Sequence, residues 1–521
     1  MSKIITAQQA AELVFDGAVI AAATIGLSGW PQEVALAIGE RFLKTGHPGK
    51  ITLMHSCACG DHQDNRNGSS SIAYDGLVTR LICAHTSSAM YMVNLVAEEK
   101  AECYLLPQGI FPQMYRSVSG NKPGVITKVG LHTFVDPRIE GAKANSITTD
   151  DIIELMEIDG EEWLRYKNLV PDIALLRCTC CDEKGNMTMD EEIVFMEQLS
   201  LASAVKNRGG TVICQVKNIA AADSLHPKRV KIPAALIDYI VVATKPEYHM
   251  QTQQTLYSPA FSGDMRVPIT ELPRTPLDAR KVINRRAAME LRKGAMVNLG
   301  KGVPEGVAHI VAEEGLAGSI ILTTELGGYG GVPAGGLDFA ATYNAEAILD
   351  HGSMFDLYDG GGLDIAFLGT AQVDRYGNVN VSKLGKNPIG PGGFINISQN
   401  THHIVFCSTF TSGAKIRIAE GKLEIVQEGK NNKFVNDLMQ ITFSSKYAEQ
   451  TGQFVLFVTE RCVFRLNNQK LALTEVAPGI DMQTQVLDLL PFSPEISPDL
   501  KSMDAALFNE TWGGLSGIIN A

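Results

Sequence analysis

The sequence predicts an α/β protein built from two similar domains in tandem, each with a mostly parallel sheet. Short β-branched runs alternate with helix-length amphipathic segments, and the same order of segments occurs twice along the 521 residues. The alternation favours parallel pairing, because each crossover helix returns the chain to the same edge of the sheet.

Six short runs have the composition of strands. Each is rich in Val, Ile and Leu and is bounded by Gly, Pro or Asp, and they cover residues 171–179, 209–218, 236–244, 318–325, 362–370 and 401–409. Apolar residues at helical spacing predict helices over 191–207 and 304–315.

The repetition predicts where the domains lie. Residues 15–38 match 292–311, and a D-x-x-G-N segment follows a strand-like run in both 171–189 and 362–381. We expect the D-x-x-G-N segments to be turns, because Asp, Gly and Asn tolerate tight backbone geometry. Two domains are the economical explanation, and we place them, with a Pro-rich polar linker between them, at 1–245, 246–278 and 279–521.

Composition excludes several classes of partner. The formal net charge is −12 and no basic stripe offsets it, so nucleic acid is not expected, and an anionic substrate would need local Lys or Arg. No run reaches the roughly 18 apolar residues of a membrane span, and the N-terminus lacks a basic region followed by a long apolar segment. These features predict a cytoplasmic protein without a membrane partner.

The ten cysteines are expected to be reduced thiols in the core, because most stand in apolar, strand-like runs. Two clusters raise the alternative of a metal site: His55, Cys57, Cys59 and His62, and the CTCC run at 178–181. Zinc prefers C-x2-4-C spacing, and alternation along a strand points neighbouring side chains to opposite faces. The sequence therefore predicts no metal site.

Glu325 is the first candidate for chemistry. It ends the predicted strand 318–325 and precedes four glycines at 327, 328, 330 and 331. The carboxyl end of a strand in an open α/β sheet is where ligands usually bind. The alternative is a Glu that caps a turn in water. The glycines favour a site, because they weaken the fold and would let a bulky ligand approach the backbone.

Three further loops could supply backbone donors. Gly300, Lys301 and Gly302 lie between a predicted strand and a helix expected to begin at Pro304, where backbone amides could face an anion. The alternative is a tight turn without a ligand, and since neither G-x-G-x-x-G nor a P-loop is matched, NAD and ATP are not indicated. Consecutive glycines at 390, 392 and 393, and Gln108 with Gly109, could form part of an oxyanion hole.

The sequence resembles the family I CoA-transferases over nearly the whole chain, most closely the acetate and propionate CoA-transferases and more distantly the succinyl-CoA:3-ketoacid enzymes. The matching stretches are 132–145, 171–192, 226–244, 297–307, 323–336, 358–385 and 390–399. The resemblance implies a three-layer α/β fold for each domain and a homo-oligomer, often a tetramer.

The resemblance also implies roles for site residues. Glu325 would be the nucleophile, Gln108 and Gly393 would border the acyl site, and the loops around Gly302 and Gly330 would help to hold CoA, which gives the candidate set Gly300, Lys301, Gly302, Gly328, Gly330 and Gly331. The basic segment 226–233 is a further candidate for the CoA phosphates, but solvated surface is its commoner fate. We favour Lys383 and Lys386, which lie near the third glycine loop. Two residues depart from the expected pattern, Leu326 after the nucleophile and Lys301 in the glycine loop, and Leu326 puts the choice of substrate in doubt.

The expected reaction transfers CoA from a short-chain acyl-CoA to a free carboxylate such as acetate, propionate or butyrate. It would follow ping-pong order through an acyl-glutamyl anhydride and a glutamyl-CoA thioester, with CoA as substrate and no tightly bound cofactor. A carboxylate needs no general base, because it is already ionised near neutral pH. Three alternatives stay open: an acyl-CoA hydrolase on the same scaffold, the CoA-transferase subunit of a lyase or decarboxylase complex, and a non-catalytic metabolite-binding protein.

Overall fold

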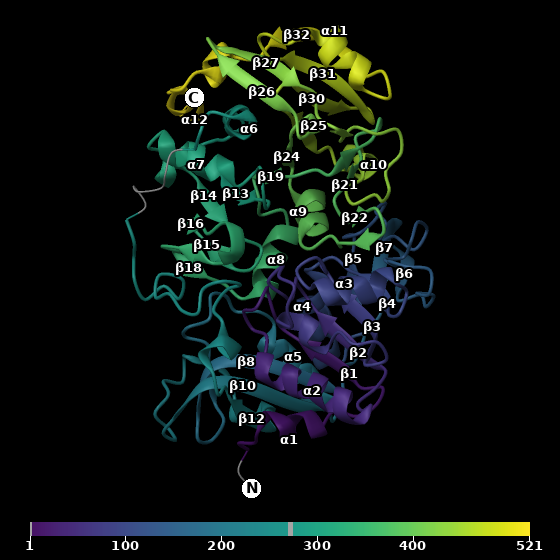
Figure 1. Cartoon of the computed structure of the whole chain (residues 1–521), viewed down its shortest axis with the longest axis vertical. Coiled ribbons are helices and arrows are strands. Elements are labelled where there is room, and N and C mark those ends of the chain that lie inside the picture. Colours follow the sequence, from purple (N-terminus) through teal and green to yellow (C-terminus); the bar gives the residue numbers. More distant parts are fainter. Residues whose placement is uncertain (1–2, 269–274, 521) are drawn as a thin grey trace. The chain divides into compact units, whose positions relative to one another are not determined.

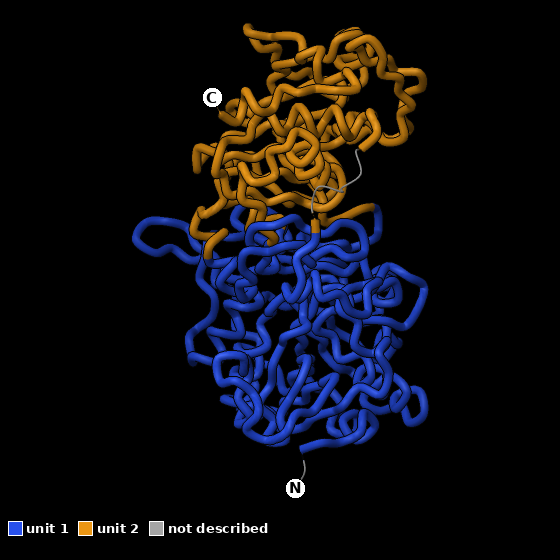
Figure 2. The backbone as a smooth tube through the Cα atoms, turned by 90° about the vertical axis from the view of Figure 1, so that its left-hand side faces the viewer, with its two compact units in different colours: residues 1–267, 325–356, 385–393 blue, residues 268–324, 357–384, 394–521 orange. Residues whose placement is uncertain are grey.

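The computed structural model describes residues 3–268 and 275–520. Contacts between Cα atoms divide the chain into two compact units (Figure 2): unit 1 comprises residues 1–267, 325–356 and 385–393, and unit 2 comprises 268–324, 357–384 and 394–521. The segment that carries Glu325 therefore packs with unit 1. Residues 269–274 of the predicted linker 246–278 lie outside the described residues, and the tandem-domain boundaries stay a prediction.

Unit 1 is built on a nine-stranded sheet whose centre is parallel (Figure 1). Adjacent strands in the order β12-β10-β8-β1-β2-β3-β4 pair in parallel, and their bounds are Tyr239–Val242, Thr211–Ala220, Ile173–Asp182, Val19–Ala22, Ile51–His55, Val78–Cys83 and Glu102–Leu105. Two short antiparallel strands, β9 (Met187–Thr188) and β11 (Val230–Ile232), complete it. This arrangement brings the carboxyl ends of β2, β3 and β4 to one edge of the sheet.

Five helices belong to the first part of unit 1: α1 (Ala7–Glu12), α2 (Gln32–Thr45), α3 (Met90–Ala97), α4 (Ile110–Ser119) and α5 (Gln198–Asn207). Helix α5 packs against β8, β10 and α4, and α1 packs against α2. Three 3-10 turns accompany them, η1 (Gly68–Ile72), η2 (Ala234–Leu236) and η3 (Pro246–His249). A small antiparallel sheet of order β5-β7-β6 is formed by Val125–Thr127, Glu161–Tyr166 and Ile153–Ile158.

The second part of unit 1 is a set of short strands around Glu325. It contains β15 (Gly328–Tyr329), β16 (Val332–Pro333), η6 (Gly336–Asp338), β17 (Thr342–Tyr343) and β18 (Ala347–Ile348). Strand β15 pairs with β18 and β16 with β17, both antiparallel. Helix α8 (His351–Asp359) begins directly afterwards, and β23 (Asn387–Pro388) lies in the last segment of the unit.

Unit 2 also has a parallel core. Strands in the order β14-β13-β19-β24-β29 pair in parallel, and their bounds are Ile321–Thr323, Met296–Leu299, Ile365–Leu368, His403–Cys407 and Phe454–Val458. The sheet continues through β30 (Cys462–Asn467), β31 (Lys470–Val476) and β32 (Glu495–Ser502). Side chains of β13, β19, β24 and β29 meet those of the helices in one apolar core.

The remaining elements of unit 2 are short. The helices are α6 (Ala279–Ala288), α7 (Gly306–Glu313), α9 (Phe394–Asn400), α10 (Ser445–Gln450), α11 (Met482–Gln485) and α12 (Leu515–Ile519), with 3-10 turns η5 (Ala317–Ser319), η7 (Leu487–Leu489) and η8 (Ala505–Phe508). The peripheral strands are β20 (Gln372–Val373), β21 (Val379–Asn380), β22 (Lys383–Leu384), β25 (Thr411–Ser412), β26 (Lys415–Ala419), β27 (Lys422–Gln427) and β28 (Asn431–Asn432).

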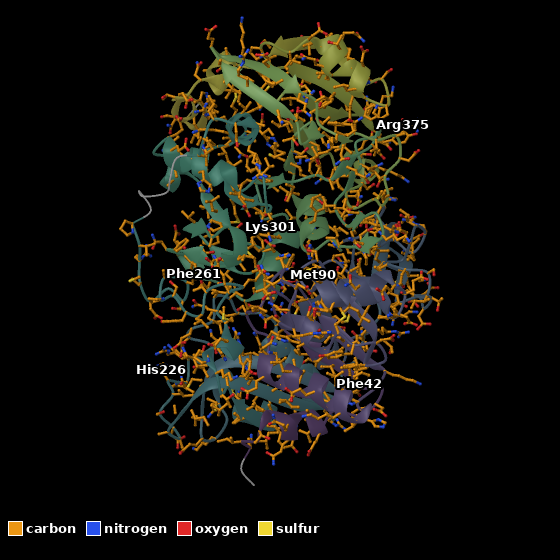
Figure 3. All side chains as sticks on the ribbon, in the orientation of Figure 1. Phe42, Met90, His226, Phe261, Lys301 and Arg375 are labelled. Carbon is orange, nitrogen blue, oxygen red and sulfur yellow. The ribbon has the colours of Figure 1, made fainter. Side chains whose placement is uncertain are left out.

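The two D-x-x-G-N segments form the same turn, as predicted. In each, the Asp carboxylate accepts the backbone N–H and the side-chain amide of the Asn four residues later: Asp182 from Asn186, and Asp374 from Asn378. Each turn joins two antiparallel strands, β8 to β9 and β20 to β21. Arg375, labelled in Figure 3, lies in the second turn.

The α/β class and the six predicted strands are confirmed, as β8, β10, β12, β14, β19 and β24. The helix predicted over 191–207 is wrong in its first half, since α5 begins only at Gln198. Glu191 and Glu192 turn back to β8 instead: the Glu191 N–H donates to Thr179 Oγ1, and Glu192 pairs with Arg177. Helix α7 begins at Gly306 after the N-cap Glu305, so Pro304 precedes the helix rather than opening it.

All ten cysteines are free thiols, and nine of them are buried, with Cys180 partly exposed. Within residues 3–268 and 275–520, no group of three or more His, Cys, Asp or Glu side chains could hold a metal ion. Nor does any helix in these ranges have the length and apolar character of a membrane span.

Candidate active site

Glu325 is half-buried and lies two residues beyond the end of β14. The hairpin that follows it is closed by backbone hydrogen bonds: the Leu349 N–H donates to the Gly327 carbonyl at 2.9 Å, and the Glu346 N–H donates to the Tyr329 carbonyl at 2.9 Å. Leu326 is completely buried. The backbone that follows Glu325 is therefore held in place by the pairing of β15 with β18.

Two of the glycines after Glu325, Gly327 and Gly331, are required by the hairpin itself. Gly327 has φ +120, and a Cβ there would lie 2.1 Å from the Leu349 carbonyl oxygen. Gly331 has φ +70, and a Cβ there would lie 2.2 Å from the Tyr343 carbonyl oxygen. The sequence argument, that bare backbone at these positions leaves room for a ligand, is thus wrong for both: the chain's own backbone fills the space.

A second loop, residues 389–393, lies against the carboxyl ends of β3 and β4. The Thr86 N–H donates to the Ile389 carbonyl, and the Gly392 N–H donates to the Ala84 carbonyl, both at 2.9 Å. The Gln108 N–H donates to the Gly392 carbonyl, also at 2.9 Å. The structure therefore brings together Gln108 and the glycine loop, which lie about 280 residues apart in the sequence and which the resemblance assigns to the same acyl site.

The Gln108 side chain is buried and reaches His351 at the start of α8. Its Nε2 lies 2.9 Å from His351 Nε2, and the other ring nitrogen, Nδ1, lies 2.7 Å from Glu197 Oε2. Neither the His351 nor the Glu197 side chain is exposed to solvent. A chain of three buried polar side chains thus connects the loop between β4 and α4, the first residue of α8 and the N-cap of α5.

Two carboxylates lie near the Cys57 thiol, which follows β2. Burial raises the pKa of Cys57 well above its ordinary value, and the negative charges of Glu197 and Glu325 raise it further. Burial likewise raises the pKa of Tyr115, with a contribution from Glu197. These shared influences place Glu325 and Glu197 in one neighbourhood at the carboxyl edge of the parallel sheet.

His55 is neutral in this environment. Burial lowers its pKa to about 4, although its hydrogen bond to Cys57 and the charge of Glu197 act in the opposite direction. Its Nδ1–H donates to the Cys57 carbonyl at 2.6 Å. Two residues of the cluster that the sequence raised as a metal alternative, His55 and Cys57, are therefore joined by a hydrogen bond.

The other candidate residues are divided between the units. Gly328, Gly330, Gly331, Lys386 and Gly393 belong to unit 1 with Glu325 and Gln108, whereas Gly300, Lys301, Gly302 and Lys383 belong to unit 2. Lys301 is exposed on the loop between β13 and α7 (Figure 3), and Gly302 has φ +99 with open space where a Cβ would stand. In the basic segment 226–233, His226, Lys228 and Arg229 are exposed, as solvated surface would be.

Sequence reasoning missed His351, Glu197 and Tyr115. Each is a single residue in an otherwise apolar or mixed segment, and no spacing or motif distinguishes it. Cys57 was noticed only as a possible metal ligand. The signal that identifies these residues is a set of buried contacts and charges: Gln108 binds His351, His351 binds Glu197, and Glu197 acts on the pKa of Tyr115 and of Cys57. These relations exist only in the folded chain.

Comparisons with known proteins found relatives along the whole chain. A family model described as Coenzyme A transferase matches residues 4–243. The chain is 50% identical to caffeate CoA-transferase of Acetobacterium woodii, over 100% of both chains. It is 41% identical to acetate CoA-transferase YdiF of Escherichia coli K12, over 97% of this chain and 95% of the relative.

Two solved structures have the same fold. The apoenzyme of the acyl-CoA transferase YdiF from Escherichia coli O157:H7 superposes with a TM-score of 0.92 at 39% identity and covers 98% of this chain and 97% of its own. A thioester complex of YdiF with CoA superposes with a TM-score of 0.91 and the same coverage.

Proposed function

Because this chain belongs to the coenzyme A transferase family, we propose that it moves CoA from an acyl-CoA to a free carboxylate through a covalent thioester on Glu325. The observation that carries the proposal is the position of Glu325, half-buried, two residues beyond the end of the parallel strand β14 and directly before the hairpin of β15 and β18. The thioester complex of YdiF, a structure 39% identical to this chain, supports a covalent CoA intermediate.

The reaction proceeds in two halves. A carboxylate oxygen of Glu325 attacks the acyl-CoA carbonyl, and the C–S bond breaks to give an acyl-glutamyl anhydride and the CoA thiolate. The thiolate then attacks the glutamyl carbonyl and releases the first acid as a carboxylate. A second carboxylate attacks the resulting glutamyl-CoA thioester, and the same two steps in reverse give the new acyl-CoA and free Glu325.

Each tetrahedral intermediate carries an oxyanion that needs hydrogen-bond donors. We assign these donors to the side-chain amide of Gln108 and the backbone N–H of Gly393, which lie in adjoining loops because the Gln108 N–H binds the Gly392 carbonyl. A single preorganised donor of this kind typically contributes about 2.7–4 kcal/mol of barrier lowering. Both donors belong to the same compact unit as Glu325.

From the family resemblance, we assign CoA binding to backbone and lysine groups of each unit: Gly328, Gly330, Gly331 and Lys386 in unit 1, and Gly300, Lys301, Gly302 and Lys383 in unit 2. The open space at Gly302 and the exposure of Lys301 suit an anionic ligand on that loop. Contacts with parts of CoA remote from the thioester would help to force the reacting carbonyl against Glu325.

The acids are proposed to be short-chain carboxylates such as acetate, propionate or butyrate. The 41% identical relative is named for acetate, and the 50% identical relative is named for caffeate. The assay of acceptor acids should therefore include caffeate beside acetate, propionate and butyrate. A homo-oligomer, with a tetramer favoured, is part of the same proposal and is checked by light scattering.

The test is to mix the purified chain with acetyl-CoA, quench, and measure the mass of the peptide that contains Glu325. We expect that peptide to gain CoA less one water, and we expect added propionate to yield propionyl-CoA. Glu325→Gln should lose both signals, whereas Glu183→Gln, at an exposed glutamate of the β8–β9 turn, should retain them.

Transfer at the parent rate by freshly purified Glu325→Gln would refute the proposal. Loss of acetyl-CoA without an acceptor acid, and without transfer when one is added, would instead identify a hydrolase. A chain that acts only with a carrier-bound thioester and a partner protein would be a lyase or decarboxylase subunit.

A further inference from the structure

We propose that His351, held by Glu197, is a positioning residue that fixes the orientation of the Gln108 side-chain amide. The inference rests on the proposed function, because it gives Gln108 its role at the oxyanion. It extends that function to two residues, His351 and Glu197, that belong to no recognised motif of the sequence.

The contact between Glu197 and His351 determines the proton on the ring. A carboxylate oxygen can only accept, so the 2.7 Å contact between Glu197 Oε2 and His351 Nδ1 places the ring proton on Nδ1. Nε2 then has the lone pair, and it accepts an N–H of Gln108 Nε2 at 2.9 Å. The carboxylate thus selects the tautomer, as carboxylates do for other buried histidines.

The contact between Gln108 Nε2 and His351 Nε2 fixes the amide. If the Gln108 amide were rotated by half a turn, its carbonyl oxygen would face the lone pair of Nε2 and the hydrogen bond would be lost. The remaining N–H of that amide is therefore held in one direction. Because the Gln108 backbone N–H is bound to the Gly392 carbonyl at 2.9 Å, the residue is held at both ends.

His351 itself is rigidly placed. Its backbone N–H donates to the Phe195 carbonyl at 2.7 Å. Its ring packs edge-on against Phe355 on the next turn of α8, with centroids 5.1 Å apart and an interplanar angle of 80°. The His351 ring is thus fixed by its backbone, by Phe355 and by Glu197, and it therefore fixes the Gln108 amide that it binds.

Burial of the Glu197 carboxylate costs free energy that its few hydrogen bonds do not offset. Its second oxygen, Oε1, is buried and has no hydrogen-bond partner in the described part of the chain. Burying a carboxylate that is incompletely bonded disfavours the folded state. Orientation of His351, and through it Gln108, is a reason to keep the charge there.

Two substitutions of His351 separate positioning from folding. His351→Asn can place an amide N–H near the position of Nδ1 and keep the bond to Glu197, but it removes the acceptor for Gln108. His351→Gln can place an amide oxygen near the position of Nε2 and restore that acceptor. We expect His351→Asn to slow formation of the glutamyl-CoA thioester by about 10- to 100-fold, and His351→Gln to recover part of the rate.

The measurement is a single-turnover reaction with acetyl-CoA, in which the amplitude counts folded sites and the rate reports the chemistry. The amplitude and the KM for acetyl-CoA should stay near the parent values. Gln108→Ala should lose about 100- to 1,000-fold in rate. The double variant Gln108→Ala/His351→Asn should be no slower than Gln108→Ala, because His351 acts through Gln108.

His249→Ala is the matched control. His249 is another buried histidine of unit 1 that contacts a glutamate, with Nε2 3.2 Å from Glu192 Oε1, and we expect it to lower stability with the single-turnover rate unchanged. Two results would overturn the inference. One is a double variant whose loss of rate equals the product of the losses in Gln108→Ala and His351→Asn. The other is a His351→Asn variant that, like His249→Ala, loses amplitude but keeps the parent rate. A parent rate in Gln108→Ala would also overturn it, while thioester formation on Glu325 would leave the proposed function intact.

Discussion

Arg177 and Glu192 form a salt bridge inside unit 1, with Nη2 and Oε2 2.5 Å apart and side chains that are 1% and 3% exposed. The Arg177 Nη1–H groups also donate to the Leu27 and Met250 carbonyls at 3.0 and 2.8 Å. The pair therefore joins β8 to three loops of the unit. It also explains why the segment before α5 leaves the helical path that its amphipathic pattern predicts.

Glu192→Gln should lower the free energy of unfolding by about 3–5 kcal/mol at pH 7, because the Arg177 guanidinium would stay buried without a counter-charge. Urea unfolding followed by circular dichroism measures the change. The control is Glu161→Gln in the exposed pair Lys128–Glu161, for which we expect about 0–1 kcal/mol. Equal effects of the two substitutions would show that burial of the first pair does not matter to stability.

Unfolding should depend on pH through His55. Burial lowers its folded pKa from 6.5 to about 4, so between these values the unfolded chain binds a proton that the folded chain does not. The contribution of His55 to the free energy of unfolding is therefore fully present above pH 6.5 and is lost as the pH falls toward 4. The loss amounts to about 3 kcal/mol in total.

His55→Asn removes this titration, and the thermal midpoint should fall less between pH 7 and pH 4.5 than in the parent. His226→Asn, at an exposed position, is the control and should keep the parent's slope. The comparison is between slopes, since the absolute stability of His55→Asn will also change. A parent-like slope in His55→Asn would assign the pH dependence to other groups.

Gly390→Ala should disturb the loop that holds Gln108. The residue has φ +92, and a Cβ would lie 2.3 Å from the Ala84 carbonyl oxygen, so the loop must move away from β3. We expect a lower thermal midpoint and a lower kcat, with a backbone strain of about 1–3 kcal/mol. Gly385→Ala is matched to it, with φ +61 and open space around the Cβ, and it should show the strain without the loss of kcat. Equal kcat values in the two variants would contradict this account.

Lys301→Ala should raise the KM for acyl-CoA about 1.4- to fivefold, the effect of an exposed charge that contributes about 0.2–1 kcal/mol. The kcat should stay near the parent value, and the difference in KM should shrink in high salt. Lys293→Ala, an exposed lysine of the same unit, should leave KM unchanged. A KM that is insensitive to Lys301 at low salt would remove this residue from the CoA site.

Local chemistry made much of the fold predictable. The strands at 173–182 and 365–368 and the two D-x-x-G-N turns depend on residues close in sequence, so their patterns are visible before folding. Helix α5 shows the limit of such patterns: its amphipathic spacing extends back to Glu191, yet the helix begins at Gln198 because a buried arginine from another strand binds Glu192.

The sequence alone made Glu325 the first candidate for chemistry, because a carboxylate between a strand and a glycine run is a local feature. Only the tertiary structure decided which side chains accompany it: Glu197 and His351 are 154 positions apart, and His351 and Gln108 are 243 apart. A hydrogen bond between such distant residues arises from the packing of whole elements, which leaves no periodicity in the chain. The glycines after Glu325 show the same division, since their number is plain in the sequence and their reason, the approach of the Leu349 and Tyr343 carbonyls, appears only when the hairpin closes.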